Sequence, residues 1–546
     1  MTNSNDAAAQ ADEMRSRLYA AQEALRAGDL DRATSVAEDA IAAGIEHPHF
    51  LTLAAYRRIE RRENEAGLVL AARACEISPN NVDALSAMGT CLAKLERPAE
   101  AVAMFDRALA EAPDDADLHF RAAVALETAK EFRRAAEEFE RTFTLEPGHA
   151  AAAARLAFLS STRGDMKKAR EAGLAALALD HRQAFASFAI ALADIDEGDF
   201  EAARRRLLEL MDIPNIGRTV RALAQNILGD ALDGMGRTAE AFAAYEQSGE
   251  VTHALYAPPP GATGETALAR SRRIAAFVAR TPAERWRSPR RGSRVPCHAF
   301  LVSFPRSGTT LLTHVLAAHP RIAALDEKRT FAESLELAAS DGGLSRLAAM
   351  GEEELETYRE AYWKRAAAGG FTGTQSVLLD KMPLNSEILC VIARLFPEAK
   401  ILFALRDPRD VVFSCFRRRF AITRQNYELL TLKSTATYYD ATMTLSELYR
   451  EKLTLPFFDV RHEDLVSDFE SQTKALCAAL GVEPDPALEN FAERARAQNI
   501  ATPNAALIGR GISRERKDQW RPYAQHLAPV MPLLAPWVAK FGYGTD

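Results

Sequence analysis

The sequence predicts an all-α solenoid of helical hairpins followed by an α/β domain with a parallel sheet. Two observations predict this. Pro79, Pro113 and Pro147 stand 34 residues apart, with small residues recurring at fixed offsets between them. Beyond about residue 298, short apolar runs alternate with helical segments, which is the pattern of strands and helices in a parallel sheet.

The first half of the chain carries small residues at regularly repeated positions. Aligning on the three prolines places Ala55, Gly89 and Ala123 at one small position, Gly67, Ala101 and Ala135 at a second, and Ala71, Phe105 and Phe139 at a third. Small residues are required where paired helices cross closely, and proline ends the second helix. The period resembles that of tetratricopeptide repeats and predicts about seven hairpins between residues 14 and 250. A plain Ala-rich bundle is the alternative.

A stack of such hairpins creates a concave groove suited to an extended peptide. The repeats are therefore expected to bind a protein or peptide, or to mediate self-association. No residue in the repeats identifies the ligand.

A proline-rich stretch, Tyr256 to Gly264, interrupts the helical pattern and is typical of a linker. We expect three segments: the repeat solenoid over 14–250, a linker with a lead-in helix over 251–297, and the α/β domain over 298–546. The expected strands of that domain are 298–304, 376–380, 400–405 and 456–460. Its expected helices are 309–318, 385–396, 408–419, 436–451 and 468–480.

The first strand leads into Phe304 to Leu312, a loop of small residues before a helix. Backbone N–H groups at a helix N-terminus favour a phosphate-like anion. The loop is P-loop-like, but Ser303 replaces the first glycine and Thr309 replaces the lysine of the nucleoside-triphosphate motif. Candidate anion-binding residues are Arg306, Ser307, Gly308, Thr309 and Thr310.

A second strand-to-helix motif runs from Lys400 to Ser414. Arg406 ends the strand, and Ser414 lies eight residues further on, two turns into the helix. Arginine suits a phosphate because its planar fork makes bidentate, permanently charged contacts. A structural salt bridge of Arg406 with Asp407 or Asp410 is the alternative.

Together the two motifs resemble those of sulfotransferases that use 3′-phosphoadenosine 5′-phosphosulfate (PAPS), especially the tyrosylprotein branch, over about the last 250 residues. The resemblance implies that the first loop holds the 5′-phosphosulfate and that Arg406 and Ser414 hold the 3′-phosphate. It implies the product 3′,5′-ADP and no metal. A C-terminal basic segment, Gly509 to Trp520, resembles the one that folds over the nucleotide and offers Arg514, Arg516 and Lys517. A solvated surface loop is the alternative.

The same resemblance suggests the residues of the chemistry. Glu327 matches the general base, Arg329 a substrate-binding residue, and Lys381 an active-site lysine that would stabilise the transferring group together with Arg306. The alternatives are an exposed charged loop for Glu327 and an ion pair with Asp380 for Lys381.

Three histidines and an arginine run receive no catalytic role. His314 and His319 lie on or at the end of the first helix and are expected to be structural, as is His462. The run Arg417 to Arg419 is expected to be solvated helix surface or to raise the local positive potential.

The composition of the chain limits which classes of function are expected. The chain has 546 residues, 48% of them hydrophobic, and a formal charge of −7, so bulk nucleic-acid binding is not expected. The polar N-terminus and the lack of an apolar run near 20 residues predict a cytoplasmic protein without a membrane span. Six scattered cysteines indicate reduced thiols and no zinc site.

The sequence therefore predicts sulfuryl transfer from PAPS to an acceptor hydroxyl, of a protein tyrosine or a small molecule. Two rivals stay open. An ATP-dependent kinase lacks its lysine and a convincing magnesium carboxylate. A nucleotide-binding repeat scaffold without catalysis requires that the candidate active-site residues have no function.

Overall fold

The structure is a computed structural model that describes residues 2–257, 264–289, 293–497 and 517–544. The chain divides into two compact units, Met1–Asp196 and Glu197–Asp546. The second unit therefore contains the last repeat helices as well as the α/β domain. The expected segments 14–250, 251–297 and 298–546 separate kinds of secondary structure and stay a prediction.

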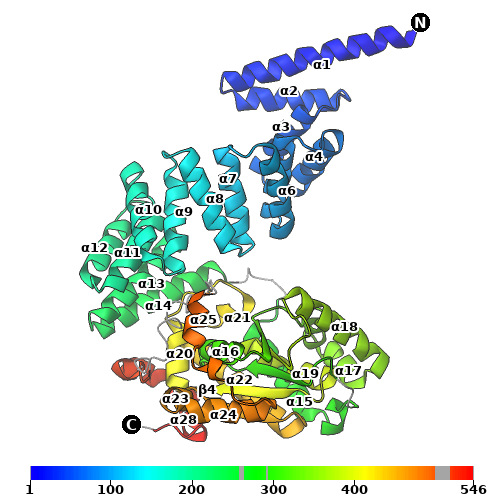
Figure 1. Ribbon diagram of the computed structural model, residues 1–546. Helices are drawn as coiled ribbons and strands as arrows, with labels where there is room; N and C mark the ends of the chain where they lie inside the picture. Colours follow the sequence, from blue (N-terminus) through cyan, green and yellow to red (C-terminus); the bar gives the residue numbers. More distant parts are fainter. Residues whose placement is uncertain (1, 258–263, 290–292, 498–516, 545–546) are drawn as a thin grey trace. The chain divides into compact units, whose positions relative to one another are not determined.

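Fourteen consecutive helices form the repeat region within the described residues, as seven predicted pairs require (Figure 1). Their bounds are α1 (Thr2–Arg26), α2 (Leu30–Ala42), α3 (Pro48–Glu60), α4 (Asn64–Ile77), α5 (Val82–Lys94), α6 (Pro98–Glu111), α7 (Ala116–Thr128), α8 (Phe132–Leu145), α9 (Ala150–Thr162), α10 (Met166–Leu179), α11 (Ala184–Glu197), α12 (Phe200–Met211), α13 (Arg218–Gly234) and α14 (Thr238–Leu255).

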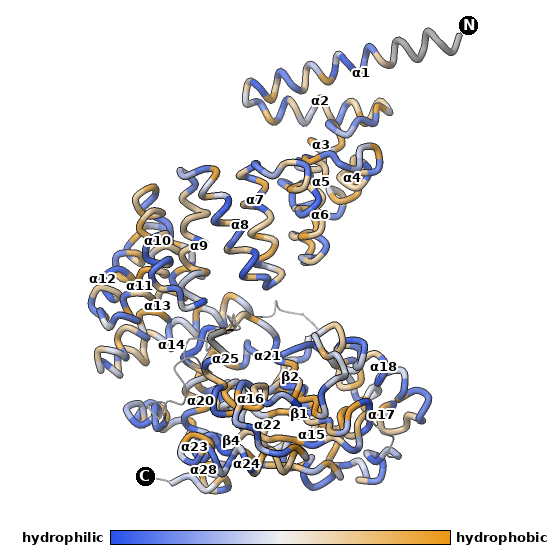
Figure 2. The backbone as a smooth tube through the Cα atoms, in the orientation of Figure 1, coloured by the Kyte–Doolittle hydropathy of each residue, from blue (hydrophilic) through white to orange (hydrophobic). Residues whose placement is uncertain are grey.

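The aligned small residues lie where the helices of a pair touch. A Cβ atom added to Gly89 would lie 2.9 Å from Cε2 of Phe105, whose ring is buried. Helices α4, α6 and α8 each end two residues before their aligned proline. Hydrophobic and hydrophilic residues alternate along α7 and α8 in Figure 2, as expected for helices that bury one face.

The α/β domain contains a sheet of five parallel strands in the order β2-β3-β1-β4-β5. The strands are β1 (Cys297–Val302), β2 (Ile322–Asp326), β3 (Val377–Lys381), β4 (Lys400–Leu405) and β5 (Phe457–Arg461). Four were predicted within two residues at each end. Strand β2 was not predicted, because its apolar run of four residues follows closely on the expected helix 309–318 and reads as a loop.

Strand β1 is buried along its whole length and lies between β3 and β4. The chain passes from β3 to β4 across β1, so the winding of the sheet reverses there. In open α/β sheets, ligands bind at the carboxyl ends of the strands at such a switch point. The loops that follow β1, β3 and β4 meet at this edge.

The helices of the domain surround the sheet (Figure 1). They are α15 (Ala267–Arg280), α16 (Thr309–Ala318), α17 (Asp341–Ala349), α18 (Glu352–Ala368), α19 (Leu389–Leu395), α20 (Pro408–Phe416), α21 (Arg424–Tyr427), α22 (Leu432–Lys452), α23 (His462–Ser467), α24 (Phe469–Leu480), α25 (Phe491–Ala497), α27 (Ala524–Leu527) and α28 (Met531–Lys540).

Three expected helices differ from those observed by more than one residue. The expected helix 436–451 already begins at Leu432. The expected helix 385–396 begins as a 3₁₀ turn, Pro383–Ile388, before α19. The expected helix 408–419 ends at Phe416, because Arg417 and Arg419 leave the helix to contact α13. The helices that were not predicted are α17, α18, α21, α23, α25, α27 and α28. None of the described helices has both the length and the apolar character of a membrane span.

The lead-in helix α15 belongs to the core of the second unit. Arg270 pairs with the buried carboxylate of Glu387 at 2.9 Å, and the Tyr438 hydroxyl donates to the same carboxylate at 2.7 Å. These contacts attach α15 to α22 and to the turn after β3. The lead-in segment thereby stabilises the side of the sheet that carries the lysine of β3.

Candidate active site

The loop between β1 and α16 presents backbone donors at the carboxyl edge of the sheet. The N–H groups of residues 308 to 311 donate to no acceptor in the described part of the chain. They lie at the positive end of the α16 dipole, where an anion is stabilised. Ser303, which replaces the first P-loop glycine, donates its hydroxyl to the Ala404 carbonyl at 2.5 Å and so ties the loop to β4.

Gly308 is required in this loop for two reasons. Its φ is +92°, a left-handed conformation that side chains rarely adopt. A Cβ atom there would also lie 2.6 Å from Nδ1 of His462 at the end of β5. Arg306, two residues earlier, has a φ of +71°, so the loop holds strained backbone at the predicted anion site.

The two predicted nucleotide motifs converge at this edge. The Arg306 Nε atom donates to Ser414 Oγ at 3.1 Å, and Arg406 Nη1 donates to the Arg306 carbonyl at 3.5 Å. Arg406 and Ser414 are each 7% exposed. Residues about 100 positions apart therefore form one basic, donor-rich cluster, although their roles as phosphate ligands stay predictions.

The expected alternative for Arg406 is also present. Arg406 Nη2 lies 3.3 Å from Asp410 Oδ2, while Asp407 pairs with Arg409 at 2.7 Å. Burial raises the pKa of Asp410, and the charge of Arg406 opposes that shift. The carboxylate of Asp410 thus holds Arg406 in place, which is compatible with phosphate binding by its other nitrogens.

Arg418 belongs to the same cluster and lies in the run Arg417 to Arg419, for which solvated helix surface or a raised local positive potential was expected. It is partly buried, and its side chain makes no hydrogen bond or ion pair with another described residue. Burial lowers its pKa to about 10, and the nearby charge of Arg306 acts in the same direction. The charge of Asp230 opposes this shift, but Arg418 makes no direct ion pair with a described carboxylate and so can pair with a bound anion. The sequence indicated this position by spacing, because Arg418 follows Ser414 by four residues and so lies on the same face of the expected helix 408–419.

The C-terminal basic segment is described only at its end. The residues Arg510, Arg514 and Arg516 lie outside the described part of the chain. Lys517 is exposed. The following backbone is anchored to the nucleotide motif, because the N–H groups of Asp518 and Trp520 donate to Asp410 at 3.1 and 3.0 Å.

Lys381 and Glu327 face each other at the ends of β3 and β2. The buried Lys381 Nζ lies 2.8 Å from Glu327 Oε1 and 2.5 Å from Asp326 Oδ1, so its ion-pair partners are not the expected Asp380. The Glu327 side chain is 59% exposed, which leaves its carboxylate accessible to an acceptor. Glu327 also has a φ of +52°. Arg329 is exposed two residues further on, and its role in substrate binding stays a prediction.

The two histidines of the first helix differ. His319 is structural, since its Nε2 lies 2.8 Å from the Glu483 carbonyl and its Nδ1 accepts from the backbone of Arg321. His314 lies near Asp326 and Lys381 instead. Burial lowers the pKa of His314, and the charge of Asp326 opposes this shift. His314 is thus neutral near pH 7 and close to the candidate catalytic pair.

A buried hydrogen-bond network surrounds Asp380, the residue that precedes Lys381 in β3. The Thr330 and Tyr362 hydroxyls donate to Asp380 Oδ2 at 2.7 and 2.9 Å, and His298 Nε2 lies 2.7 Å from the Tyr362 hydroxyl. Burial raises the pKa of Asp380 from 3.8 to about 6, against the effect of these hydrogen bonds. Asp380 therefore links the loop after Glu327 to the strand that carries Lys381.

The raised pKa of Asp380 predicts a pH dependence of stability. The unfolded carboxyl ionises near pH 4 and the folded one near pH 6, so the folded state binds more protons between these values and stability falls as pH rises through them. Between pH 4 and pH 7 we expect the free energy of unfolding of the wild type to fall by about 2 kcal/mol relative to that of Asp380→Asn. All four tryptophans lie in the second unit, so their fluorescence during urea unfolding measures this. The prediction is wrong if the difference in unfolding free energy between the wild type and Asp380→Asn does not change with pH.

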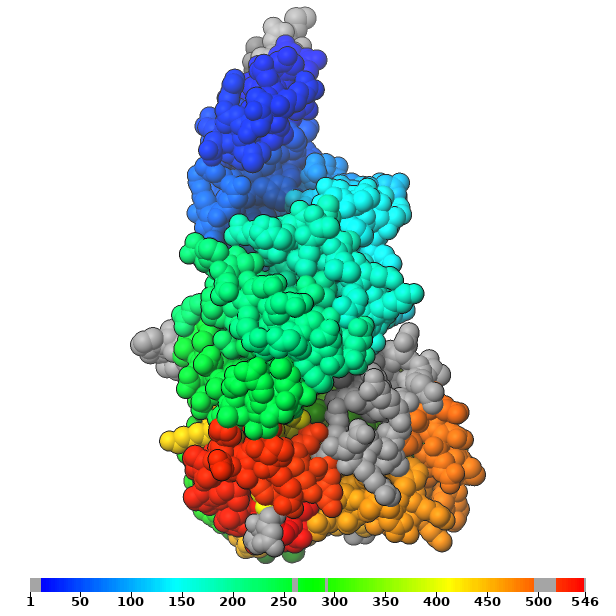
Figure 3. All heavy atoms as spheres, turned by 90° about the vertical axis from the view of Figure 1, so that its left-hand side faces the viewer, coloured from blue at the N-terminus to red at the C-terminus, as the bar shows by residue number. Residues whose placement is uncertain are grey.

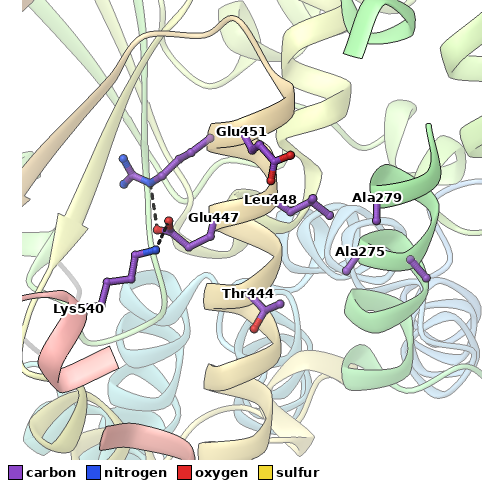
Figure 4. A pocket seen from close by; sticks show the side chains of 9 residues that line it. Ala275, Ala279, Thr444, Glu447, Leu448, Glu451 and Lys540 are labelled. Atoms are coloured by element: carbon purple, nitrogen blue, oxygen red, sulfur yellow. Dashed lines mark hydrogen bonds and ion pairs between the residues drawn. The ribbon is translucent and has the colours of Figure 1, made fainter. Parts of the chain in front are cut away.

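A cavity elsewhere in the domain has no part in the site. It has a volume of about 760 Å³ and lies between α15, α22 and α28, where Glu447 pairs with Arg450 and Lys540 (Figure 4). None of the motif residues lines it. Among the described residues, no cluster of three or more His, Cys, Asp or Glu side chains is arranged to hold a metal ion.

A loop with positive φ at Arg306 and Gly308 follows the central strand of a five-stranded parallel sheet, so the domain has an α/β architecture. Residues 298–486 match the family model described as "Sulfotransferase family", and residues 58–126 match the one described as "Tetratricopeptide repeat". The chain carries a domain of the sulfotransferase family together with tetratricopeptide repeats.

Three relatives illustrate the match. Protein-tyrosine sulfotransferase 1 of Danio rerio is 24% identical over 267 residues, which cover 45% of this chain and 71% of that protein. Omega-hydroxy-beta-dihydromenaquinone-9 sulfotransferase Stf3 of Mycobacterium tuberculosis is 29% identical over 135 residues, 24% of this chain and 34% of that protein. A solved sulfotransferase domain from the Synechococcus PCC 7002 olefin synthase is 25% identical with a TM-score of 0.34, covering 47% of this chain and 99% of that one. This chain spans only 32% and 35% of the length of some other curated relatives.

Proposed function

We propose that this protein transfers a sulfuryl group from PAPS to an acceptor hydroxyl. The observation that carries the proposal is that Arg306, Arg406 and Ser414 converge after β1 and β4, at the same carboxyl edge of the sheet as the Lys381–Glu327 pair. One end of this edge is rich in donors for phosphates, and the other end has an accessible carboxylate. A sulfuryl transfer needs both within one site.

The residues present fit PAPS. The N–H groups of residues 308 to 311 and the side chain of Arg306 suit the 5′-phosphosulfate. Arg406 and Ser414 suit the 3′-phosphate, and the unpartnered Arg418 adds a charge beside them. PAPS supplies the sulfuryl group, and its other product is 3′,5′-ADP.

The residues at the ends of β2 and β3 accept the proton of the acceptor hydroxyl and stabilise the negative charge of the leaving group. Glu327 accepts the proton of the acceptor hydroxyl as the new O–S bond forms, and the S–O bond to the 5′-phosphate breaks. Lys381 stabilises the negative charge on the oxygen of the broken bond, together with Arg306. Asp326 keeps its ion pair with Lys381 and so orients the lysine while Glu327 leaves it to accept the proton.

The acceptor class is a hydroxyl, of a protein tyrosine or of a small molecule. The relatives named above include proteins named for sulfation of protein tyrosine and of a menaquinone derivative. Arg329, exposed beside Glu327, is the residue proposed to contact the acceptor. The repeats are proposed to bind a protein or peptide in their groove or to mediate self-association. We also propose a cytoplasmic location, supported by six unpaired cysteines.

Calorimetric titration with 3′,5′-ADP, ATP and ADP tests the nucleotide class. We expect the wild type to bind 3′,5′-ADP and to bind ATP at least tenfold more weakly, because Thr309 stands where a triphosphate site has lysine. Arg406→Ala should weaken 3′,5′-ADP binding by about a hundredfold, since it removes a charged, buried donor. Preference for ATP would support a kinase. Binding without any transfer to an acceptor would support the scaffold.

A further inference from the structure

The arginines that follow α20 are held by the last pair of repeat helices. Arg417 Nη1 lies 3.1 Å from Asp233 Oδ2, and Arg419 Nη1 lies 2.7 Å from Asp230 Oδ2 and 2.9 Å from Asn226 Oδ1. Helix α13 and these arginines belong to the same compact unit. The repeat helix therefore touches the segment that extends the nucleotide motif of Ser414.

The three residues of α13 form one stripe. Asn226, Asp230 and Asp233 stand at positions i, i+4 and i+7 and so share a helix face. Asn226 also donates its Nδ2 to the Arg417 carbonyl at 3.3 Å, so the stripe fixes the backbone of the arginine segment as well as its side chains.

Residues of the repeat pattern orient this stripe. A Cβ atom at Gly229 would lie 2.4 Å from the ring of Tyr245 on α14, so only glycine admits the ring. The Tyr245 hydroxyl then donates to Asp230 Oδ1 at 3.0 Å. The close crossing of the two repeat helices thus fixes the carboxylate that holds Arg419.

Apolar contacts attach the same helices to the domain. The ring of Phe242 lies 5.3 Å from that of Phe416 and stacks on His526 at 4.3 Å. The Tyr523 hydroxyl donates to Asp233 Oδ1 at 2.5 Å. Figure 3 shows the C-terminal segment (red) directly against these repeat helices (green). Exposed ion pairs alone are weak, but this packing limits the motion of the charged groups.

We propose that Asp230 and Asp233 are positioning residues of the nucleotide site, which hold Arg417 and Arg419 so that Arg418 stays beside Arg306. The proposal rests on the proposed function and adds a role for the repeats in it. Without the two carboxylates, three consecutive arginines beside Arg306 repel one another and move toward solvent. With them, Arg418 is kept in place without a carboxylate of its own, and a nucleotide phosphate supplies the missing charge.

The test measures 3′,5′-ADP binding by calorimetry and the KM and kcat for PAPS in the full chain. Asp230→Asn with Asp233→Asn keeps side-chain shape but removes both charges. We expect the dissociation constant and the KM for PAPS to rise about tenfold, with kcat changed less than twofold. Glu246→Gln, an exposed glutamate on α14, is the matched control and should change neither.

A double-mutant cycle makes the pairing specific. Arg419→Gln removes the arginine of the Arg419–Asp230 pair. Its effect on 3′,5′-ADP binding should not add to that of Asp230→Asn, because both variants remove the same contact. If the wild type binds 3′,5′-ADP and every one of these variants binds within twofold of it, or if the two effects add in full, the inference is overturned while the proposed function stands. If the wild type itself binds no 3′,5′-ADP, both are overturned.

Discussion

Glu327→Gln is expected to lower kcat for sulfuryl transfer by about 10² to 10⁴, the usual contribution of a general base. Glutamine keeps the shape of the side chain but accepts no proton at neutral pH. The dissociation constant for 3′,5′-ADP should stay within twofold of the wild type, because Glu327 lies at the end of β2, away from Arg406 and Ser414. A variant that binds the nucleotide but does not transfer separates catalysis from binding.

The measurement is the release of 3′,5′-ADP from PAPS with a panel of acceptors: an acidic tyrosine peptide, a simple phenol and a long-chain alcohol. Glu398→Gln is the control, since Glu398 is exposed near the start of β4, at the opposite edge of the sheet. Wild-type kcat in Glu327→Gln would remove Glu327 as the base and move attention to His314, the other candidate beside Lys381.

Lys381→Met is expected to lower kcat by about 10² to 10³, because it removes the buried cation closest to Glu327. The same change leaves Asp326 and Glu327 side by side without a counter-charge. We therefore also expect a loss of about 1 to 3 kcal/mol in the stability of the second unit, measured by tryptophan fluorescence during urea unfolding.

A companion variant separates these two effects. Lys381→Met combined with Asp326→Asn removes one of the crowded carboxylates, so stability should partly recover while kcat stays low. Recovery of kcat together with stability would mean that Lys381 only supports the fold. Wild-type kcat in Lys381→Met, with folding preserved, would exclude a role in the chemistry altogether.

Local sequence was sufficient to predict the two strand-to-helix motifs and the repeats. Each depends on residues close together in the chain: Gly308 at a helix start, Arg406 eight residues before Ser414, and small residues at a 34-residue period. A left-handed glycine, a helix N-terminus and a close helix crossing have the same requirements in any fold, so the residue types alone reveal them.

Strand β2 and the partners of Lys381 depended on tertiary structure. The apolar run of β2 is too short to distinguish from a loop, and it becomes a strand because β3 offers it an unpaired edge. Its register then places Asp326 opposite Lys381, which is why the lysine pairs with Asp326 and Glu327 rather than with its neighbour Asp380.

The sequence by itself therefore determined the repeat solenoid, the parallel-sheet domain and the two strand-to-helix loops, because each is encoded within a few turns of chain. Only the tertiary structure decided that Arg418 lies beside Arg306 and that Asp230 and Asp233 hold its neighbours. Those contacts join segments more than 100 residues apart. Their energy comes from charges brought together by folding, which no local pattern records.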